Sequence, residues 1–322
     1  MHYRTLGKTG LSVSEVGYGA WGIGQSGWVG ARDDESLNAL HRAIDLGVNF
    51  IDTALAYGDG HSEQLVGQVV RSRSERVYIA TKIPPKNGKW PAPSKIPSDQ
   101  AFPGSYVRQC TERSLKNLGL DRIDVQQFHV WSDEWVGQGD WLETIEALKH
   151  EGKIGAFGIS INDHQPNNAL RLIETGVVDM VQVIYNIFDQ TPEDALFPAC
   201  QQHQVGVIVR VPFDEGGLTG KITPETEFAA EDFRSHYFHG DRKRDVHARA
   251  LAISRDLNIS VDDLADAALR FTLAPDAVST VIPGMRTLSN VERNCQVSDG
   301  RKLSSDRLAL LKRHRWERNF YQ

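Results

Sequence analysis

Eight short apolar runs, rich in Val and Ile, recur along this chain and alternate with stretches of helical periodicity. They lie at residues 15–18, 49–52, 77–81, 123–128, 154–159, 179–184, 206–210 and 278–282. Repeated strand–helix units of this kind build a parallel sheet that is covered by helices. Because no linker rich in Pro, Gly or Ser divides the chain, we predict one α/β domain over residues 1–322, a (β/α)8 TIM barrel with extra helices.

The segment before the first strand has a pattern of its own. Residues 3–17 contain two short strand-like runs joined at Gly7 to Gly10, which predicts an N-terminal β-hairpin that closes the bottom of the barrel. Capping residues then mark several expected helix starts, at Asp33, Ser62, Thr191 and Ser260.

Two connections, 83–104 and 212–242, are too long to be simple turns. Loops of this length inside a compact domain are usually lids or binding loops. Both follow strands, so we expect both to emerge on the catalytic face of the barrel, where the carboxyl ends of the strands converge.

The overall charge and the cysteines limit the partners and the compartment. Lys and Arg number 36 against 42 Asp and Glu, so the net charge of −6 offers no general attraction to nucleic acid or to a membrane surface. No segment is apolar enough for export or membrane insertion. Three widely spaced cysteines, Cys110, Cys200 and Cys295, suit buried thiols in a reducing compartment. We therefore expect a cytoplasmic monomer or small homo-oligomer.

Two tempting motifs lack the context that their functions need. Gly17, Gly19 and Gly22 satisfy GxGxxG after a strand, but the residues that follow, IGQSGWVGARDD, cannot form the helix on which a dinucleotide phosphate would sit. A glycine-rich loop over the barrel mouth is the favoured interpretation. His236 and His239 have no companion ligands at metal-binding spacing, so no metal site is expected.

Four residues with complementary proton chemistry follow three successive predicted strands. Asp52 and Tyr57 come from FIDTALAYG, Lys82 from VYIATK and His129 from DVQQFH. Taken singly, each also has a purely structural interpretation. Asp52 could cap a loop and Tyr57 could be an ordinary loop aromatic. Lys82 could be a surface charge and His129 a polar residue whose hydrogen bonds are satisfied. Because the carboxyl ends of barrel strands meet at one mouth, we expect the four to converge there.

The chemistry of these four groups assigns their roles. A free Tyr has a pKa of about 10, and a neighbouring ammonium favours its phenolate, so Lys82 would make Tyr57 a better acid. Asp52 would keep Lys82 charged in a partly dry site. His129, if neutral, can orient a carbonyl or share a proton with Tyr57. The sequence thus predicts a catalytic tetrad with Tyr57 as the acid.

Motifs spread over almost the whole chain strengthen this prediction. In order they are VGYGAWGIG, FIDTALAYG, FGIS, VQVIYN, GGLTGK and IPGMRTLSNVERN. Together they resemble the aldo-keto reductases, and most of all the bacterial branch related to the potassium-channel β subunits. The resemblance implies NADPH or NADP+ as cofactor, NAD being the less favoured choice, and it implies that Asp52, Tyr57, Lys82 and His129 are the catalytic tetrad.

The same resemblance assigns a coenzyme site across the barrel mouth. Ser160 and Gln182 match positions that hold the nicotinamide carboxamide. The other matching cofactor positions are Gly19, Ala20, Trp21, Asp52, Arg210, Val211, Pro212, Phe213, Gly216, Leu218, Gly220, Lys221, Gly284, Arg286, Asn290 and Asn294.

The segment after the eighth strand supports a phosphate site on independent grounds. It leaves the strand at Pro283 and Gly284 and opens a helix near Leu288, so its amides and Arg286 can form an anion site. An Arg here suits the 2′-phosphate of NADP. The alternative is an ordinary surface Arg in a helix-start loop.

The chain departs from the family pattern at two positions. Ile161 stands where an Asn usually follows the serine of the fifth strand, and Asn162 comes one residue later. Arg210 stands where an aromatic residue commonly stacks on the nicotinamide. Its guanidinium can stack on a flat ring, or can pair with Asp214 or with a cofactor phosphate.

For the substrate we expect a small carbonyl compound in a pocket of Trp21, Tyr57, His129 and Trp131, with Trp90 as a further candidate and core packing as the alternative for Trp131 and Trp90. The predicted function is NADPH-dependent reduction of an aldehyde, ketone or sugar carbonyl, an EC 1.1.1 activity. The alternatives are an NAD-dependent aldose dehydrogenase and a nicotinamide-binding redox-sensing regulatory protein.

Overall fold

The strands predicted from the sequence form one curled parallel sheet in the computed structural model, which describes residues 1–93 and 95–322. Neighbouring strands follow sequence order from β3 to β10, and every pair is parallel. Their bounds are β3 Tyr18–Gly19, β4 Phe50–Asp52, β5 Tyr78–Ile83, β6 Ile123–Phe128, β7 Ile154–Ser160, β8 Met180–Ile184, β9 Gly206–Arg210 and β10 Val278–Val281.

The two edges of this sheet meet and close the barrel. The amide of Gly17 donates to the Val281 carbonyl at 2.8 Å, and the amide of Val281 donates to the Glu15 carbonyl at 2.9 Å. Single bridges join Val16 to Val281 and Gly19 to Gly284. The predicted (β/α)8 fold is confirmed, but the first strand was placed too early, because residues 15–17 make this closure and only Tyr18–Gly19 pair regularly with β4.

The predicted N-terminal hairpin is present and plugs one end of the barrel. Strand β1 (Tyr3–Thr5) pairs antiparallel with β2 (Ser12–Ser14). Leu6 packs into the barrel interior, in a cluster with Phe50, Met180 and Ile208. Gly7 lies at φ +51°, where a Cβ would meet the Gly206 amide at 2.2 Å, so only glycine fits this approach to the start of β9.

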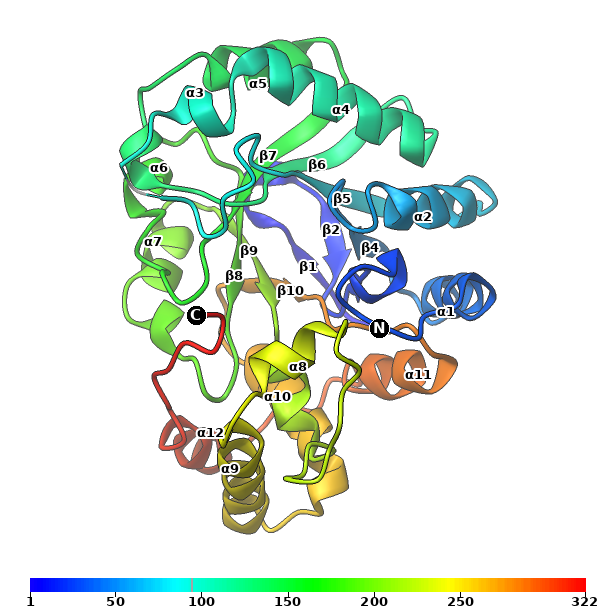
Figure 1. The fold of residues 1–322 in the computed structure, drawn as a ribbon, viewed down its shortest axis with the longest axis vertical. Coiled ribbons are helices and arrows are strands. Elements are labelled where there is room, and N and C mark those ends of the chain that lie inside the picture. The colour runs from blue at the N-terminus through cyan, green and yellow to red at the C-terminus, as the bar shows by residue number, and fades with distance from the viewer. Residues whose placement is uncertain (94) are drawn as a thin grey trace.

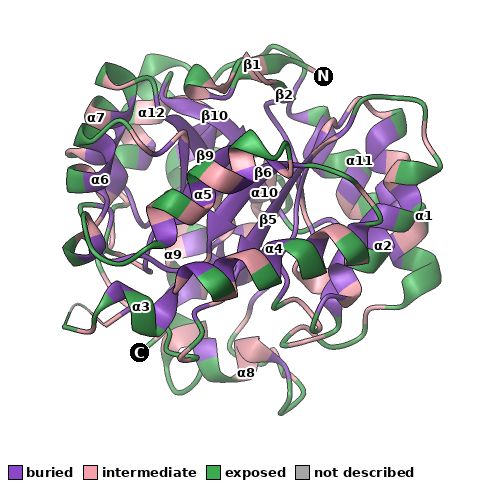
Figure 2. Cartoon of the chain, turned by 90° about the horizontal axis from the view of Figure 1, so that it is seen from above, coloured by how far each residue is buried: buried purple, intermediate pink, exposed green. Residues whose placement is uncertain are grey.

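Helices surround the strands (Figure 1) and turn their buried faces toward them (Figure 2). The main helices of the successive strand–helix units are α1 Asp33–Asp45, α2 His61–Arg71, α4 Gly104–Leu118, α5 Trp141–His150, α6 Leu170–Glu174, α7 Leu196–Gln202, α10 Leu264–Thr272 and α11 Leu288–Gln296. The extra helices are α3 Ser98–Ala101, α8 Phe233–Tyr237, α9 Arg242–Leu257 and α12 Ser305–Lys312. Short 3-10 turns are η1 Gly7–Thr9, η2 Gly22–Gly24, η3 Asp133–Trp135, η4 Thr191–Glu193, η5 Asp214–Thr219 and η6 Val261–Asp263.

The predicted helix starts lie close to the observed ones, but only some of the predicted side chains act as N-caps. Ser260 is an N-cap, since its hydroxyl accepts from the Asp262 amide. Asp33 and Ser62 lie inside their helices and cap nothing. The carboxylate of Asp33 binds His61 at 2.9 Å, and the hydroxyl of Ser62 donates to the Ala20 carbonyl at 2.8 Å. Asp33 therefore joins α1 to α2, and Ser62 joins α2 to the glycine-rich segment beyond β3.

Two further sequence expectations can be compared with the structure. The three cysteines are buried free thiols, as predicted, and burial raises the pKa of Cys200 to about 12 and that of Cys295 to about 11. Within residues 1–93 and 95–322, none of the helices has the length and apolar character needed to cross a lipid bilayer.

Candidate active site

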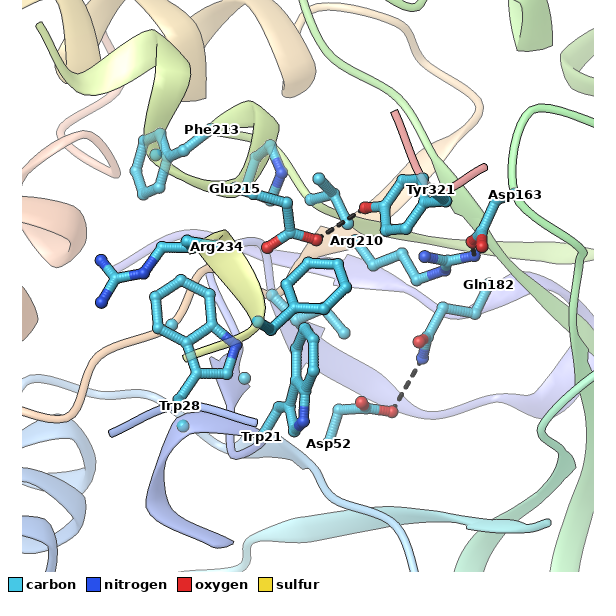
Figure 3. Close-up of a pocket in the computed structure, with 18 of the residues that line it drawn as sticks. Trp21, Trp28, Asp52, Asp163, Gln182, Arg210, Phe213, Glu215, Arg234 and Tyr321 are labelled. Carbon is cyan, nitrogen blue, oxygen red and sulfur yellow. Dashed lines mark hydrogen bonds and ion pairs between the residues drawn. The ribbon is translucent and has the colours of Figure 1, made fainter. Parts of the chain in front are cut away.

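A cavity of about 790 Å³ lies at the carboxyl ends of the strands. The strands supply Ser160, Asp52, Gln182 and Arg210 to its lining, and Figure 3 shows the last three. Both long connections reach it, the first through Trp90 and Pro91 and the second through residues between Pro212 and Arg234. The prediction that these connections emerge on this face is therefore confirmed.

A buried ion pair between Lys82 and Asp52 lies at the base of the cavity. Because Asp52 pairs with Ala80 in the ladder of β4 and β5, Lys82 projects inward from the same face, two residues further along β5. Neither side chain is more than 2% exposed. The Lys82 ammonium donates to the Asp52 carboxylate, to the Thr53 carbonyl at 2.9 Å and to the Tyr57 hydroxyl at 3.3 Å.

The second oxygen of Asp52 is also satisfied. It accepts from Gln127 Nε2 at 3.0 Å and from Gln182 Nε2 at 2.8 Å (Figure 3). Burial by itself would lower the pKa of Lys82, but the Asp52 charge and the Tyr57 phenol outweigh it and raise that pKa. Lys82 therefore stays an ammonium, as the sequence predicted.

The pKa of Tyr57 shifts in the direction opposite to the one predicted. Lys82 does lower the pKa of the Tyr57 phenol, but burial raises it by more, so the net pKa lies above its ordinary value. The prediction of a net lowering was wrong because it left out the desolvation of a phenolate in a largely closed site. Tyr57 is thus protonated at neutral pH and holds a proton to give.

His129 completes the group beside Tyr57. Its ring is 5.5 Å from the Tyr57 ring and 4.5 Å from the Trp90 ring, edge to face in both cases. Burial, followed by the charges of Lys82 and Arg210, lowers the pKa of His129 well below its ordinary value, so the imidazole is neutral. The structure brings all four predicted residues together.

Arg210, the departure at the end of β9, is anchored beside this centre. Its guanidinium donates to Asp163 Oδ1 at 2.6 Å and to the Ile161 carbonyl at 3.1 Å, while its Nε is buried without a partner in the part of the chain that the structure describes. The suggested pairing with Asp214 is wrong, because Asp214 binds Arg318 instead. The guanidinium is therefore tied to the residues just after β7, and Arg210 lines the cavity (Figure 3).

The structure also shows what the side chain of Asn162 does at the other departure from the family pattern, after β7. Ser160 and Gln182 line the cavity from adjacent strands, as expected. The amide side chain of Asn162 contacts the Ala92 backbone at 3.2 and 3.3 Å and Gln165 at 3.1 Å. Asn162 therefore ties the connection after β5 to the end of β7.

Most predicted positions in the segment after β9 line the cavity, but two do not. Val211, Pro212, Phe213, Gly216 and Lys221 belong to the lining. The side chain of Leu218 is fully buried in the main core, and Gly220 packs so closely on Val261 that a Cβ would lie 2.5 Å from its carbonyl oxygen. Residues 214–219 form a 3-10 turn, and Leu218 and Gly220 lie outside the cavity lining.

The predicted phosphate end is formed by the segment after β10. Helix α11 begins at Leu288, and the Thr287 hydroxyl caps it by accepting from the Asn290 amide. Gly284, Arg286, Asn290 and Asn294 all line the cavity. The predicted helix start is therefore confirmed, and Arg286 lies in the cavity lining.

Arg286 has neighbours that the sequence did not suggest. Its Nη1 donates to the Val29 carbonyl at 2.9 Å, and its guanidinium lies 5.6 Å from the Trp28 ring. The guanidinium of Arg234, from α8, lies over the same ring at 4.3 Å. Two loops far apart in the sequence thus place two cations around one indole at this end of the cavity.

Of the tryptophans predicted for the substrate pocket, Trp90 takes the place of Trp131 in the cavity lining. Trp21 lines the cavity, and its ring is stacked 6.2 Å from that of Tyr57. Trp131 does not, because it is fully buried among Phe128, Trp135 and Trp141 in the core. Trp90, the further candidate, is the tryptophan that reaches the cavity beside His129.

Several lining residues were missed by sequence reasoning. They include Trp28, Asp163, Glu215, Arg234 and Tyr321 (Figure 3). Asp163 and Glu215 lie just beyond strand ends, so their position was a usable signal. Tyr321 carries no such signal, since only the path of the folded chain brings it to the mouth.

Comparison with known proteins matches the chain to the Aldo/keto reductase family over residues 15–315. It is 29% identical over 321 residues to the uncharacterized oxidoreductase YqkF of Bacillus subtilis, covering 98% of this chain and 96% of the relative. A probable voltage-gated potassium channel β subunit of Arabidopsis thaliana is 27% identical, covering 93% and 92%. The solved holo form of aldo-keto reductase AKR11C1 from Bacillus halodurans superposes with a TM-score of 0.76, at 26% identity and full coverage of both chains.

Proposed function

This chain belongs to the aldo/keto reductase family, and from that premise we propose that it reduces aldehyde, ketone or sugar carbonyls with NADPH, with Tyr57 as general acid. The observation that carries the proposal is the contact of the Tyr57 hydroxyl with the buried Lys82–Asp52 pair, at 3.3 Å from the ammonium. A protonated phenol beside a fixed cation, in a cavity of this size, suits protonation of a carbonyl oxygen.

Each member of the tetrad has a separable task in this proposal. Tyr57 binds the substrate oxygen and gives it a proton. Lys82 stabilises the phenolate left behind, and Asp52 keeps Lys82 charged. His129, neutral and with a buried Nδ1 that has no partner among the described residues, orients the carbonyl. When bound, the coenzyme supplies the hydride.

The cavity fits a long polar ligand such as a nicotinamide dinucleotide. Besides His129, two lining residues carry a buried nitrogen without a partner among the described residues, Trp28 at Nε1 and Arg210 at Nε. Ser160 and Gln182 would hold the carboxamide end, and Arg286, Asn290 and Asn294 the adenosine end. The remaining proposed contacts are Gly19, Ala20, Trp21 and the cavity-lining part of residues 211–221.

The test of the proposal is consumption of NADPH on a panel of aldehydes, ketones and sugars, followed by the coenzyme's absorbance. Turnover on any carbonyl class supports a reductase. Tight NADPH binding without turnover on the whole panel would instead favour the redox-sensing regulatory alternative, which the likeness to a channel β subunit keeps open.

Coenzyme choice gives a first quantitative prediction. Replacing Arg286 by Gln removes a cation from the proposed 2′-phosphate site, so the Kd for NADPH is expected to rise about 10- to 100-fold, the scale of one or two charge-assisted hydrogen bonds. The Kd for NADH, which lacks that phosphate, should change little. Fluorescence titration measures both. Arg42→Gln, which removes a surface Arg paired with Glu292 of α11, is the control, and equal losses for both coenzymes would contradict the assignment.

Arg210 gives a prediction about the charge of the coenzyme. Its guanidinium acts on both Tyr57 and His129, so it also reaches a nicotinamide that reacts there. A fixed cation disfavours the positive nicotinamide of NADP+ relative to neutral NADPH. Arg210→Met should therefore lower the ratio of the NADP+ Kd to the NADPH Kd, by about three- to tenfold, whereas Arg210→Lys, which keeps the charge, should not. Parallel changes in both constants would show that Arg210 acts only through packing.

A further inference from the structure

The segment that follows β9 has an unfavourable backbone. Three residues without the freedom of glycine have positive φ, Val211 at +56°, Asp214 at +52° and Glu215 at +54°, and Gly216 follows at +107°. For a β-branched residue such as Val211 this is a marked outlier. Conformations of this kind persist only where surrounding contacts hold them. Residues 211–216, called here the strained loop, must therefore be held from outside.

Residues 318–321 bind both acidic side chains of the strained loop, while Asn186 Nδ2 donates to the Val211 carbonyl at 3.0 Å. The guanidinium of Arg318 forms an ion pair with the Asp214 carboxylate, and the two side chains are only 7% and 2% exposed. The hydroxyl of Tyr321 donates to Glu215 Oε1 at 2.6 Å (Figure 3). Asp214 also accepts from the Tyr237 hydroxyl at 3.0 Å. Both acidic side chains at positive φ are thus bound.

Aromatic rings hold these partners in place. The Arg318 guanidinium lies over the rings of Trp316, Phe320 and Phe188, at 4.5, 4.8 and 5.1 Å. The Tyr321 ring lies 5.0 Å from that of Tyr237. Arg318 and Tyr321, called here the clasp, are therefore held by aromatic contacts that do not involve the strained loop, and these contacts allow them to support its shape.

We infer that Arg318 and Tyr321 are positioning residues for the coenzyme, because they hold the strained loop in the shape that forms one wall of the cavity. The inference rests on the proposed function, since it assigns that wall to the coenzyme. Val211, Pro212, Phe213, Glu215 and Gly216 all line the cavity. Opening the clasp lets the strained loop relax and the coenzyme leave.

Glu215, the residue of the strained loop that Tyr321 binds, titrates near neutrality. Burial raises the pKa of Glu215 to about 7, and the charged or titratable groups that face it are Tyr321, Asp214, Tyr237, Arg210 and Asp163. An acid whose folded pKa is raised supports the fold at low pH, and that support is lost as the pH rises through about 7. Coenzyme release should therefore quicken as the pH rises from the ordinary pKa of a Glu, about 4.3, to about 7 and should level off above it, and Glu215→Gln should remove this dependence.

The experiment measures NADPH dissociation by stopped-flow fluorescence in wild type, Tyr321→Phe and Arg318→Met. Tyr321→Phe keeps the ring and removes one hydroxyl, so it tests the hydrogen bond without a large loss of packing. Both variants are expected to release NADPH about tenfold faster or more. The KM for NADPH should rise in both variants, and in Arg318→Met, whose side chain lies outside the cavity lining, the single-turnover rate at saturating NADPH should stay within about twofold. Arg315→Met, which breaks an exposed pair with Asp194 in the same segment, is the matched control.

A second measurement does not depend on the coenzyme. If the clasp shapes the strained loop, trypsin should cut after Lys221 faster in the ligand-free clasp variants than in the control. Unchanged dissociation and unchanged cleavage in Tyr321→Phe and in folded Arg318→Met would overturn the inference. A wild-type protein that binds no NADPH would overturn the proposed function instead, and the cleavage assay would still decide whether the clasp holds the loop.

Discussion

Replacing Tyr57 by Phe is expected to lower carbonyl reduction by about 10²- to 10⁴-fold, the usual contribution of a positioned general acid. The variant keeps the ring that lies 6.2 Å from Trp21 and 5.5 Å from His129, so the cavity keeps its shape. It loses only the hydroxyl that meets Lys82. NADPH binding should therefore survive while turnover is lost.

Steady-state rates and NADPH titration on the same preparation check this prediction. Tyr78→Phe, at the start of the strand that carries Lys82, is the matched control because it removes a phenol away from the cavity. Equal activity of Tyr57→Phe and wild type would remove Tyr57 from the chemistry. Since the pKa of Tyr57 is raised in the folded protein, reduction should also stay level with pH across the neutral range.

Asp52→Asn should cost about 3–5 kcal/mol of folding stability at neutral pH, because it leaves the Lys82 ammonium buried without its counter-charge. The amide has the size of the carboxylate, so packing changes little. By contrast Asp34→Asn, which breaks an ion pair whose side chains are more than 60% exposed, should leave the folding stability almost unchanged, because water screens the pair. Urea unfolding of both variants measures the difference.

The pH dependence gives this prediction a sign. With Asp52 present, the pKa of Lys82 is raised, so the stabilisation is present below the unfolded pKa of about 10.4 and is lost only as the pH rises through the folded pKa. Without Asp52, burial dominates and the pKa of Lys82 falls below the unfolded value. Stability of the variant should therefore increase as the pH rises from neutral toward about 10.

A double variant separates charge from packing. Adding Lys82→Met to Asp52→Asn removes the stranded ammonium, so the double variant should be more stable than Asp52→Asn alone and should lose the pH dependence. An Asp52→Asn protein as stable as wild type at every pH would show that the pair is not ionised.

Local pattern was enough to predict the barrel and the convergence of its candidate catalytic residues. Alternating apolar runs located all eight strands to within a few residues, because strand periodicity is written in neighbouring residues. Parallel strands in a closed barrel send their carboxyl ends to one mouth, so Asp52, Lys82 and His129 could be brought together without coordinates. The start of α11 at Leu288 was likewise predictable from its local residues.

Tertiary structure alone decided which side chains face the cavity and what holds them. Trp131 and Leu218 follow closely after strands whose carboxyl ends form the mouth, yet both side chains are buried in the main core. Burial, which no local pattern measures, reversed the expected shift of the Tyr57 pKa. Arg318 reaches Asp214 across 104 residues and Tyr321 reaches Glu215 across 106. Such contacts depend on where the whole chain passes, and for that reason the sequence determined the chemistry of this site while the fold determined its walls.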